Sequence, residues 1–260
     1  MRSGIPLIFS SCQPSPTSRS PGSAGDAALT PRILETPPSR RSAVSAPLLK
    51  ICGLRQPAQA AAIAGLGVDA IGVIAVPQSP RWLAPAQRPD LFAAMRAASP
   101  SCLGVLVCAD PGDHELAPLE PSQGHGVIQL HGSESPERCL ELRRRFGCAV
   151  WKAIRLRQPA DRSRVDAYAG SVDAVLLDAW VPDQLGGTGH RIPLEWLRDW
   201  RPALPWWLAG GITASRAAAL LGQLSPTGLD ASSGVERAPG DKDLDQVRAL
   251  LGAVRASGRA

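Results

Sequence analysis

An aspartate and a cysteine far apart in the chain have the chemistry of a proton-transfer pair. Asp178 ends an apolar run, and a glycine-rich segment, residues 186–189, follows soon after it. Cys52 likewise ends a short apolar run, and Gly53 follows it directly. A carboxyl group and a thiol at the ends of two strands can act as general acid and general base if the fold brings them together. We therefore predict that Cys52 and Asp178 are catalytic, and that Gly187 lies near a bound anion.

Two later clusters of small residues indicate a phosphate site. Gly210 and Gly211 follow one apolar run, and Ser232, Ser233 and Gly234 follow the next. Glycines let the backbone approach an anion closely, and serines donate hydrogen bonds to it. The alternative is that each cluster is only a tight turn between a strand and a helix.

Other strand ends carry polar candidates of weaker individual meaning. Arg81 follows Ser79 and Pro80, and a second anionic group of a substrate, such as a carboxylate, is its natural partner. His131 either orients the substrate or holds a loop, while Cys108 and Arg155 are candidates for supporting roles. Taken alone, Arg81 would be read as a solvated surface charge and Cys52 as an inert buried thiol.

The elements that must position these residues alternate regularly between strand and helix. We predict strands at residues 48–52, 70–76, 103–108, 126–131, 149–154, 172–178, 206–209 and 228–231. We predict helices at residues 57–65, 85–98, 112–121 (weak, because Pro118 interrupts it), 136–146, 159–168, 193–200, 213–222 (with Thr213 as N-cap) and 243–256.

This alternation predicts an α/β fold, a (β/α)8 TIM barrel. About 210 residues carry all the strand–helix units, which suits one barrel domain. An open doubly wound sheet has fewer units and a glycine fingerprint after its first strand, which the sequence following Gly53 lacks. In a barrel the active site lies at the carboxyl ends of the strands, and the loops after the seventh and eighth strands usually hold phosphate.

Composition argues against several other classes of protein. The net charge of +5 is scattered and forms no basic stripe with aromatics, so no nucleic-acid partner is predicted. No apolar run approaches the ~20 residues that cross a bilayer, so no membrane partner is predicted. The six cysteines form no C-x-x-C pair, which argues against a zinc site and favours reduced thiols in an intracellular protein.

Residues 1–46 differ from residues 47–260, which we assign to the barrel domain. The first segment is rich in Pro, Ser and Arg, and only Asp26 and Glu35 are acidic. It lacks hydrophobic periodicity, so we predict a disordered extension. Its composition also suits an organelle transit peptide, and an upstream start codon would explain it equally well. We expect a cytoplasmic enzyme, or a plastid one if the extension is a transit peptide.

Short motifs are spread over the chain from about residue 48 to 255. They are Lys50-Ile51-Cys52-Gly53-Leu54, Pro77-Gln78-Ser79-Pro80-Arg81, Gln129-Leu130-His131-Gly132, Leu176-Leu177-Asp178-Ala179, Gly186-Gly187-Thr188-Gly189, Leu208-Ala209-Gly210-Gly211-Ile212 and Ser232-Ser233-Gly234-Val235-Glu236. In these motifs and in their order the chain resembles the phosphoribosylanthranilate isomerase family of tryptophan biosynthesis. The resemblance implies a (β/α)8 barrel that performs an Amadori rearrangement of N-(5-phosphoribosyl)anthranilate, without a metal or organic cofactor.

The resemblance also implies roles for individual residues. Asp178 would protonate the furanose ring oxygen, and Cys52 would then remove the proton from the adjacent sugar carbon. Arg81 would pair with the anthranilate carboxylate, and Gly211, Ser232 and Ser233 would hold the phosphate. His190 and Cys108 stand where relatives carry lysine and asparagine, and Arg55 and Gln59 also depart from the pattern.

Three rival functions remain open from the sequence. The isomerase of histidine biosynthesis performs the same rearrangement, but it uses two aspartates, and Cys52 argues against it. A silent barrel that only binds a phosphorylated metabolite would be expected to lack Cys52 or Asp178. A binding role for the N-terminal segment is weak because it has few arginines. We expect a monomer in which Trp196, Trp200, Trp206 and Trp207 pack within the fold, although an interface is the alternative.

Overall fold

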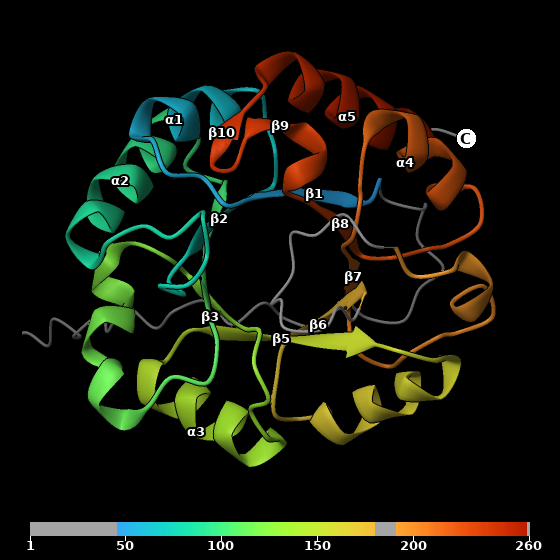
Figure 1. Cartoon of the computed structure of the whole chain (residues 1–260), viewed down its shortest axis with the longest axis horizontal. Helices are drawn as coiled ribbons and strands as arrows, with labels where there is room; N and C mark the ends of the chain where they lie inside the picture. The colour runs from blue at the N-terminus through green and yellow to red at the C-terminus, as the bar shows by residue number, and fades with distance from the viewer. Residues whose placement is uncertain (1–45, 180–190, 259–260) are drawn as a thin grey trace, which may run out of the picture. The chain divides into compact units, whose positions relative to one another are not determined.

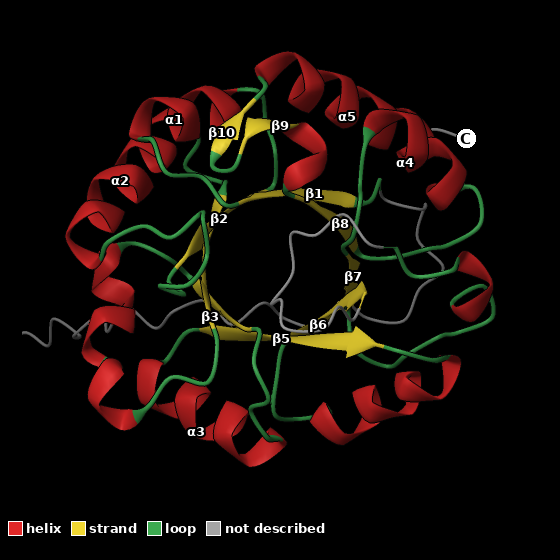
Figure 2. Cartoon of the chain, in the orientation of Figure 1, coloured by secondary structure: helices red, strands yellow, loops and turns green. Residues whose placement is uncertain are grey.

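Eight parallel strands form a closed barrel in the computed structural model, which describes residues 46–179 and 191–258. Each strand pairs with its neighbour in the sequence, and β1 pairs with β8 to complete the circle. Helices surround the strands in Figures 1 and 2. The predicted (β/α)8 barrel is therefore confirmed, and all its strands direct their carboxyl ends to one face.

The barrel strands are β1 (Leu48–Cys52), β2 (Ala70–Ile74), β3 (Leu103–Cys108), β4 (Val127–Leu130), β5 (Ala149–Leu156), β6 (Ala174–Ala179), β7 (Trp206–Leu208) and β8 (Gly228–Ala231). The α-helices are α1 (Pro57–Gly65), α2 (Arg88–Ala98), α3 (Pro136–Phe146), α4 (Ala214–Leu221) and α5 (Leu244–Ser257). The 3₁₀ segments are η1 (Pro85–Gln87), η2 (Asp113–Glu115), η3 (Ala117–Leu119), η4 (Pro121–Gln123), η5 (Pro159–Tyr168), η6 (Leu194–Trp196) and η7 (Ser233–Val235).

Alternate residues of each strand build two separate cores. Side chains such as Leu49, Ile51 and Val175 pack outward in the layer between strands and helices. Side chains such as Cys52 and Leu176 belong to the second cluster, which fills the barrel interior. This alternation follows from the two-residue period of a strand, and it places Cys52 and Asp178 on the inner side of β1 and β6.

Four of the described tryptophans divide between the two cores. Trp207 lies in the barrel interior and packs on Trp151, with ring centroids 4.8 Å apart. Trp206, its neighbour along β7, lies in the outer core against Trp200 with centroids 5.4 Å apart. These rings therefore pack within the fold.

Several predicted helices are shorter or tighter than expected. Residues 112–121 form no α-helix but a chain of 3₁₀ turns, because Pro118 and Pro121 interrupt the hydrogen-bond ladder. The helix predicted at residues 193–200 is reduced to η6, and residues 159–168 form the 3₁₀ helix η5. Thr213 is the N-cap of α4, but its hydroxyl lies 3.1 Å from that of Ser215 and makes no capping bond to the backbone.

A short hairpin beyond β8 was not predicted. It consists of β9 (Glu236–Ala238) and β10 (Asp241–Lys242), and Gly240 has a φ of +84° in its turn. Gln59 of α1 donates to the Asp241 carboxylate at 2.5 Å and accepts from the Lys242 N–H at 3.1 Å. The hairpin is thereby fixed beside α1 and β1 (Figure 2).

The described part of the chain contains no helix with the length and apolar character needed to cross a membrane. The predicted N-terminal extension, residues 1–46, lies outside the described residues except for Ala46.

Candidate active site

Cys52 ends β1 with its thiol in the barrel interior and only 6% of its surface exposed. Burial raises the pKa of the thiol above its ordinary value, and the cations of Lys50 and Lys242 act in the opposite direction. Gly72 lies next to the thiol, because a Cβ added to this glycine would be 2.6 Å from Cys52 Sγ. The glycine therefore leaves the space that the Cys52 side chain fills.

Lys50 lies two residues before Cys52 and also faces the interior. Its ammonium is fully buried and is 3.0 Å from both carboxylate oxygens of Asp230, which comes from β8. Burial alone would lower the pKa of Lys50, but attraction from Asp230 and Cys52 outweighs it and leaves the pKa raised. A buried ion pair thus lies directly behind the predicted base.

Asp178 ends β6 on the interior side and is 6% exposed. One of its carboxylate oxygens accepts the backbone N–H of Ala179 at 2.9 Å. The other lies 3.7 Å from His131 Nε2, which is slightly beyond hydrogen-bonding distance. The structure therefore brings Asp178 and His131 together at the same mouth of the barrel.

His131 is oriented by a neighbour on its own strand. Its Nδ1 lies 3.2 Å from the side-chain amide nitrogen of Gln129. With the amide assigned in this orientation, Gln129 donates to Nδ1, so the ring proton lies on Nε2, the atom nearest Asp178. Such a ring can donate to an oxygen at or beside the Asp178 carboxyl group.

Arg81 is held in a two-pronged ion pair with Glu236 of β9. Its Nε is 2.9 Å from one carboxylate oxygen and its Nη2 is 2.7 Å from the other. Lys242 Nζ is 2.6 Å from the same carboxylate, and the Gly240 N–H donates to it at 3.0 Å. Burial would raise the pKa of Glu236, but hydrogen bonds from Arg81 and Lys242 outweigh it and leave the pKa lowered.

The guanidinium keeps donors for another partner. Arg81 Nη1 makes no hydrogen bond to any residue of the described ranges. The side chain runs past Gly53, where a Cβ would lie 2.5 Å from Arg81 Cδ and 3.3 Å from Ser232 Oγ. Gly53 thus allows Arg81 and the loop after β8 to meet.

The loops after β7 and β8 lie in close contact through their glycines. Gly210 and Gly211 both have positive φ, at +92° and +59°. A Cβ on Gly234 would lie 2.1 Å from the backbone oxygen of Ile212, so only glycine fits between the two loops. The two small-residue clusters predicted from the sequence are therefore adjacent, as a shared anion site requires.

Two other candidates have contrasting positions. Cys108 belongs to the outer core, and burial raises its pKa far above the usual range, so it does not face the mouth. Arg155 is the register partner of Asp178 across β5 and β6, which supports its candidacy. Gly187 and His190 lie outside the described residues.

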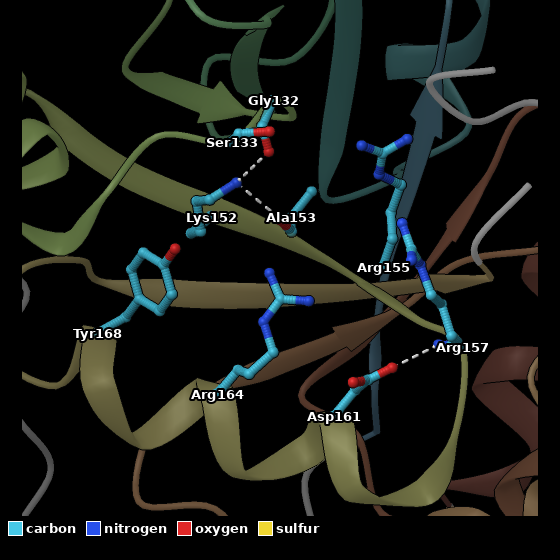
Figure 3. Close-up of a pocket in the computed structure, with 9 residues that line it drawn as sticks. All are labelled: Gly132, Ser133, Lys152, Ala153, Arg155, Arg157, Asp161, Arg164 and Tyr168. Carbon is cyan, nitrogen blue, oxygen red and sulfur yellow. Dashed lines mark hydrogen bonds between the residues drawn. The ribbon is translucent and has the colours of Figure 1, made fainter. Parts of the chain in front are cut away.

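A cavity of about 330 Å³ opens beside this mouth rather than at Cys52. Figure 3 shows the residues around it, which come from the loop after β4, from β5 and the loop that follows it, and from η5. Its lining contains more cations than anions and consists of Gly132, Ser133, Lys152, Ala153, Arg155, Arg157, Asp161, Arg164 and Tyr168. Among these cations, Lys152 already has partners within the protein: its ammonium is 2.8 Å from the Gly132 backbone oxygen and 3.0 Å from the Glu134 carboxylate.

Sequence reasoning did not identify Lys50, Asp230, Glu236 and Lys242 as parts of the site. The available signal was a charge within an apolar strand: Lys50 interrupts the run that ends at Cys52, and Asp230 interrupts the short run of β8. Such charges are rarely buried without a partner. In the described ranges, no group of three or more His, Cys, Asp or Glu residues is placed to hold a metal ion.

Comparison with known proteins gives one consistent result. The family model described as N-(5'phosphoribosyl)anthranilate (PRA) isomerase matches residues 49–253. An N-(5'-phosphoribosyl)anthranilate isomerase of Synechococcus elongatus is 45% identical over 204 residues, which cover 78% of this chain and 94% of that protein.

Solved structures agree with that match. The crystal structure of phosphoribosyl anthranilate isomerase from Thermus thermophilus is 32% identical, with a TM-score of 0.67 over 80% of this chain and 98% of the other. A phosphoribosyl anthranilate isomerase solved in complex with reduced 1-(o-carboxyphenylamino)-1-deoxyribulose 5-phosphate is 25% identical, with a TM-score of 0.67 over 81% of this chain and 99% of the other.

Proposed function

The chain belongs to the N-(5'-phosphoribosyl)anthranilate isomerase family, and we propose from this that it rearranges N-(5'-phosphoribosyl)anthranilate to 1-(2-carboxyphenylamino)-1-deoxyribulose 5-phosphate in tryptophan biosynthesis. The observation that carries the proposal is the combination of a thiol and a carboxyl group on the inner side of β1 and β6, at the end of the barrel where the β7 and β8 loops meet. The complex of a related isomerase with the reduced product supports the substrate class.

Asp178 acts as the general acid in this proposal. It protonates the furanose ring oxygen, the C–O bond of the ring breaks, and the nitrogen lone pair forms a positively charged imine. His131, with its Nε2 3.7 Å from the carboxylate, is placed to orient the acid or the sugar oxygen. Proton transfer of this kind contributes roughly 10²–10⁴-fold to the rate.

Cys52 acts as the general base. The positive imine acidifies the C–H bond at the adjacent sugar carbon, so the thiolate can remove that proton. The resulting enolamine then tautomerises to the ketone. The buried surroundings that raise the pKa of the thiol also make the thiolate, once formed, a stronger base than a solvated one.

Two anchors hold the substrate on either side of the reacting carbons. The proposed phosphate site consists of Gly210, Gly211 and the segment 232–234, with Gly187 as a further candidate. Arg81 is proposed to receive the anthranilate carboxylate through the donors that Glu236 leaves open. Fixing both ends confines the labile middle of the substrate near the acid and the base.

The direct test is turnover of freshly generated N-(5'-phosphoribosyl)anthranilate, followed by the loss of its anthranilate-type fluorescence. The product is then separated from anthranilate by chromatography, because spontaneous hydrolysis also consumes the substrate. Formation of the rearranged product above the uncatalysed rate supports the proposal. A protein that binds the reduced product without any turnover would instead be a silent phosphosugar-binding barrel.

We also propose that the protein acts as a monomer in the cytoplasm, or in a plastid if residues 1–46 are a transit peptide. Sedimentation analysis of the full chain distinguishes a monomer from a dimer. A fusion of residues 1–46 to a fluorescent protein, compared with the unfused fluorescent protein in plant cells, reports whether the segment directs import.

A further inference from the structure

The thiol of Cys52 shares its small interior space with the side chain of Lys50. Both side chains lie beside Gly72: a Cβ added to this glycine would be 2.6 Å from Cys52 Sγ and 3.1 Å from Lys50 Cε. Lys50 is fully buried, and Asp230 holds its ammonium at 3.0 Å. The lysine is therefore fixed next to the sulfur and cannot move away into solvent.

The buried charges around this space form two groups of ion pairs. Lys50 pairs with Asp230, whereas Arg81 and Lys242 both pair with Glu236. The first group is neutral, and the second carries one positive charge in excess. Loss of the thiol proton would add a buried negative charge, which is costly unless a cation such as Lys50 lies near it.

The groups acting on the thiol come from three elements. Lys50 of β1 and Lys242 of β10 favour the thiolate, whereas Asp230 of β8 disfavours it. Lys242 is itself engaged with Glu236 at 2.6 Å, and Lys50 exerts the larger effect of the two cations on the pKa of the thiol. The two members of the Lys50–Asp230 pair thus act on Cys52 in opposite directions.

We propose that Lys50 is a positioning residue for the Cys52 base: its buried ammonium, held in place by Asp230, compensates the negative charge on Sγ when the thiol is deprotonated. This inference rests on the proposed role of Cys52 as the base. It assigns to the Lys50–Asp230 ion pair a function in setting the protonation of the thiol, and not only in filling the barrel.

Lys152 provides a matched control. It is 2% exposed and forms an ion pair with the buried Glu134 at 3.0 Å, so its removal also leaves a buried carboxylate unpaired. However, it lies on the outer side of β5, because its neighbours Trp151 and Ala153 are the residues that face the interior with Cys52. Lys50→Met and Lys152→Met therefore impose similar structural costs, and only the first removes a charge beside the thiol.

The test is a pH titration of the Cys52 thiolate by its ultraviolet absorbance, taken as the difference between each protein and its Cys52→Ser counterpart. We expect Lys50→Met to raise the titration midpoint by about 1–3 pH units, or beyond the pH range in which the protein stays folded. Asp230→Asn should lower the midpoint, because a negative neighbour is removed. Lys152→Met should leave it where it is in the unsubstituted protein.

Circular dichroism at each pH establishes that the variants are folded. An unchanged midpoint in Lys50→Met, or an equal shift in Lys152→Met, would overturn the proposal. If Lys50→Met does not fold, Asp230→Asn decides the question, and an unchanged or raised midpoint there counts against it. The titration needs no substrate, so the two proposals fail separately. These shifts without isomerase turnover would retract the role of Cys52 as the base, and the effect of Lys50 on the protonation of the thiol would still stand.

Discussion

At the scale of single residues, Arg81 pairs with Glu236 and is also proposed to bind the substrate carboxylate. Its guanidinium holds Glu236 through Nε and Nη2 and still has donors left for a substrate carboxylate. A planar, forked group can serve both partners at once, whereas an ammonium is a point charge with no fixed fork. Glu236 therefore orients Arg81 for the substrate and does not compete with it.

The first prediction is that Arg81→Lys lowers kcat/KM by roughly ten- to a hundredfold, mainly through a higher KM, because hydrogen bonds to a charged group contribute about 1.5–3 kcal/mol. Steady-state kinetics with the natural substrate measures the effect. Arg237→Lys is the matched control, since Arg237 also pairs with a carboxylate, that of Asp241, but is exposed. Equal KM values for Arg81→Lys and the unsubstituted protein would show that Arg81 does not hold the substrate.

His125 gives a prediction for stability against pH. Burial lowers its pKa from 6.5 to about 4, while its Nε2 lies 3.1 Å from the Leu119 oxygen. As the pH falls, His125 is therefore protonated near pH 6.5 in the unfolded chain but only near pH 4 in the folded protein. Its contribution to the free energy of unfolding is fully present above pH 6.5 and is lost as the pH drops towards 4, with a loss of roughly 2 kcal/mol at pH 5.

Chemical unfolding at pH 7.5 and pH 5 checks this prediction. His125→Asn removes the titrating group and should make the difference between the two pH values smaller by that amount. An identical difference in the variant and the unsubstituted protein would mean that His125 titrates normally in the folded state.

At the scale of elements, the loops after β7 and β8 are in such close contact that a single added methyl group would disturb them. Gly234→Ala would place a Cβ 2.1 Å from the Ile212 oxygen, so one loop must shift. We expect a loss of stability of about 1–3 kcal/mol, typical of overpacking, together with weaker inhibition by inorganic phosphate. Thermal unfolding and phosphate inhibition of turnover measure the two effects.

Gly252→Ala is the control for this change. Gly252 lies in α5, and nothing lies within 4 Å of a Cβ at that position. Alanine there should leave phosphate inhibition unchanged and stabilise the helix by about 0.5–1 kcal/mol. A Gly234→Ala protein that behaves like Gly252→Ala would refute the assigned contact between the two loops.

Element boundaries were predicted where local signals were strong. Pro136 begins α3, and the Ser135 hydroxyl caps it by accepting the Arg138 backbone N–H at 3.3 Å. Gly147 ends the helix at a φ of +59°, so both limits could be predicted from the sequence. The segment 112–121 was misread as a helix because its apolar residues contact the outer core through 3₁₀ turns that prolines enforce. The β9–β10 hairpin was missed because its strands are too short and polar to show a period.

The candidate site was predictable only where a residue stands at a strand end. Cys52, Asp178 and the two glycine–serine clusters were found in this way, because parallel strands bring their carboxyl ends to one face. Lys50 was not found because its partner Asp230 is 180 residues away in the sequence, and a long-range ion pair leaves no periodic signal. Lys242 was not found because the hairpin that brings it to Glu236, 6 residues away, was itself missed.

At the scale of the whole molecule, the described residues are enough to close the barrel. The β1–β8 pairing that completes the circle begins at Leu48, and its partner strand starts at Gly228. We therefore predict that deletion of residues 1–45 leaves the thermal unfolding temperature and the turnover unchanged. Differential scanning calorimetry and the fluorescence assay on the full and shortened chains test this. A large drop in either property would show that the segment contributes to the fold or the site.

The central claim is that one acid and one base, on β6 and β1, perform the rearrangement. The measurement that tests it most directly is the kcat of Cys52→Ala and Asp178→Asn with N-(5'-phosphoribosyl)anthranilate, on proteins whose circular dichroism matches that of the unsubstituted chain. We predict a loss of at least roughly 10²-fold in each variant with KM little changed, because each residue acts on the transition state. A folded variant of either kind that keeps its full kcat would contradict the account.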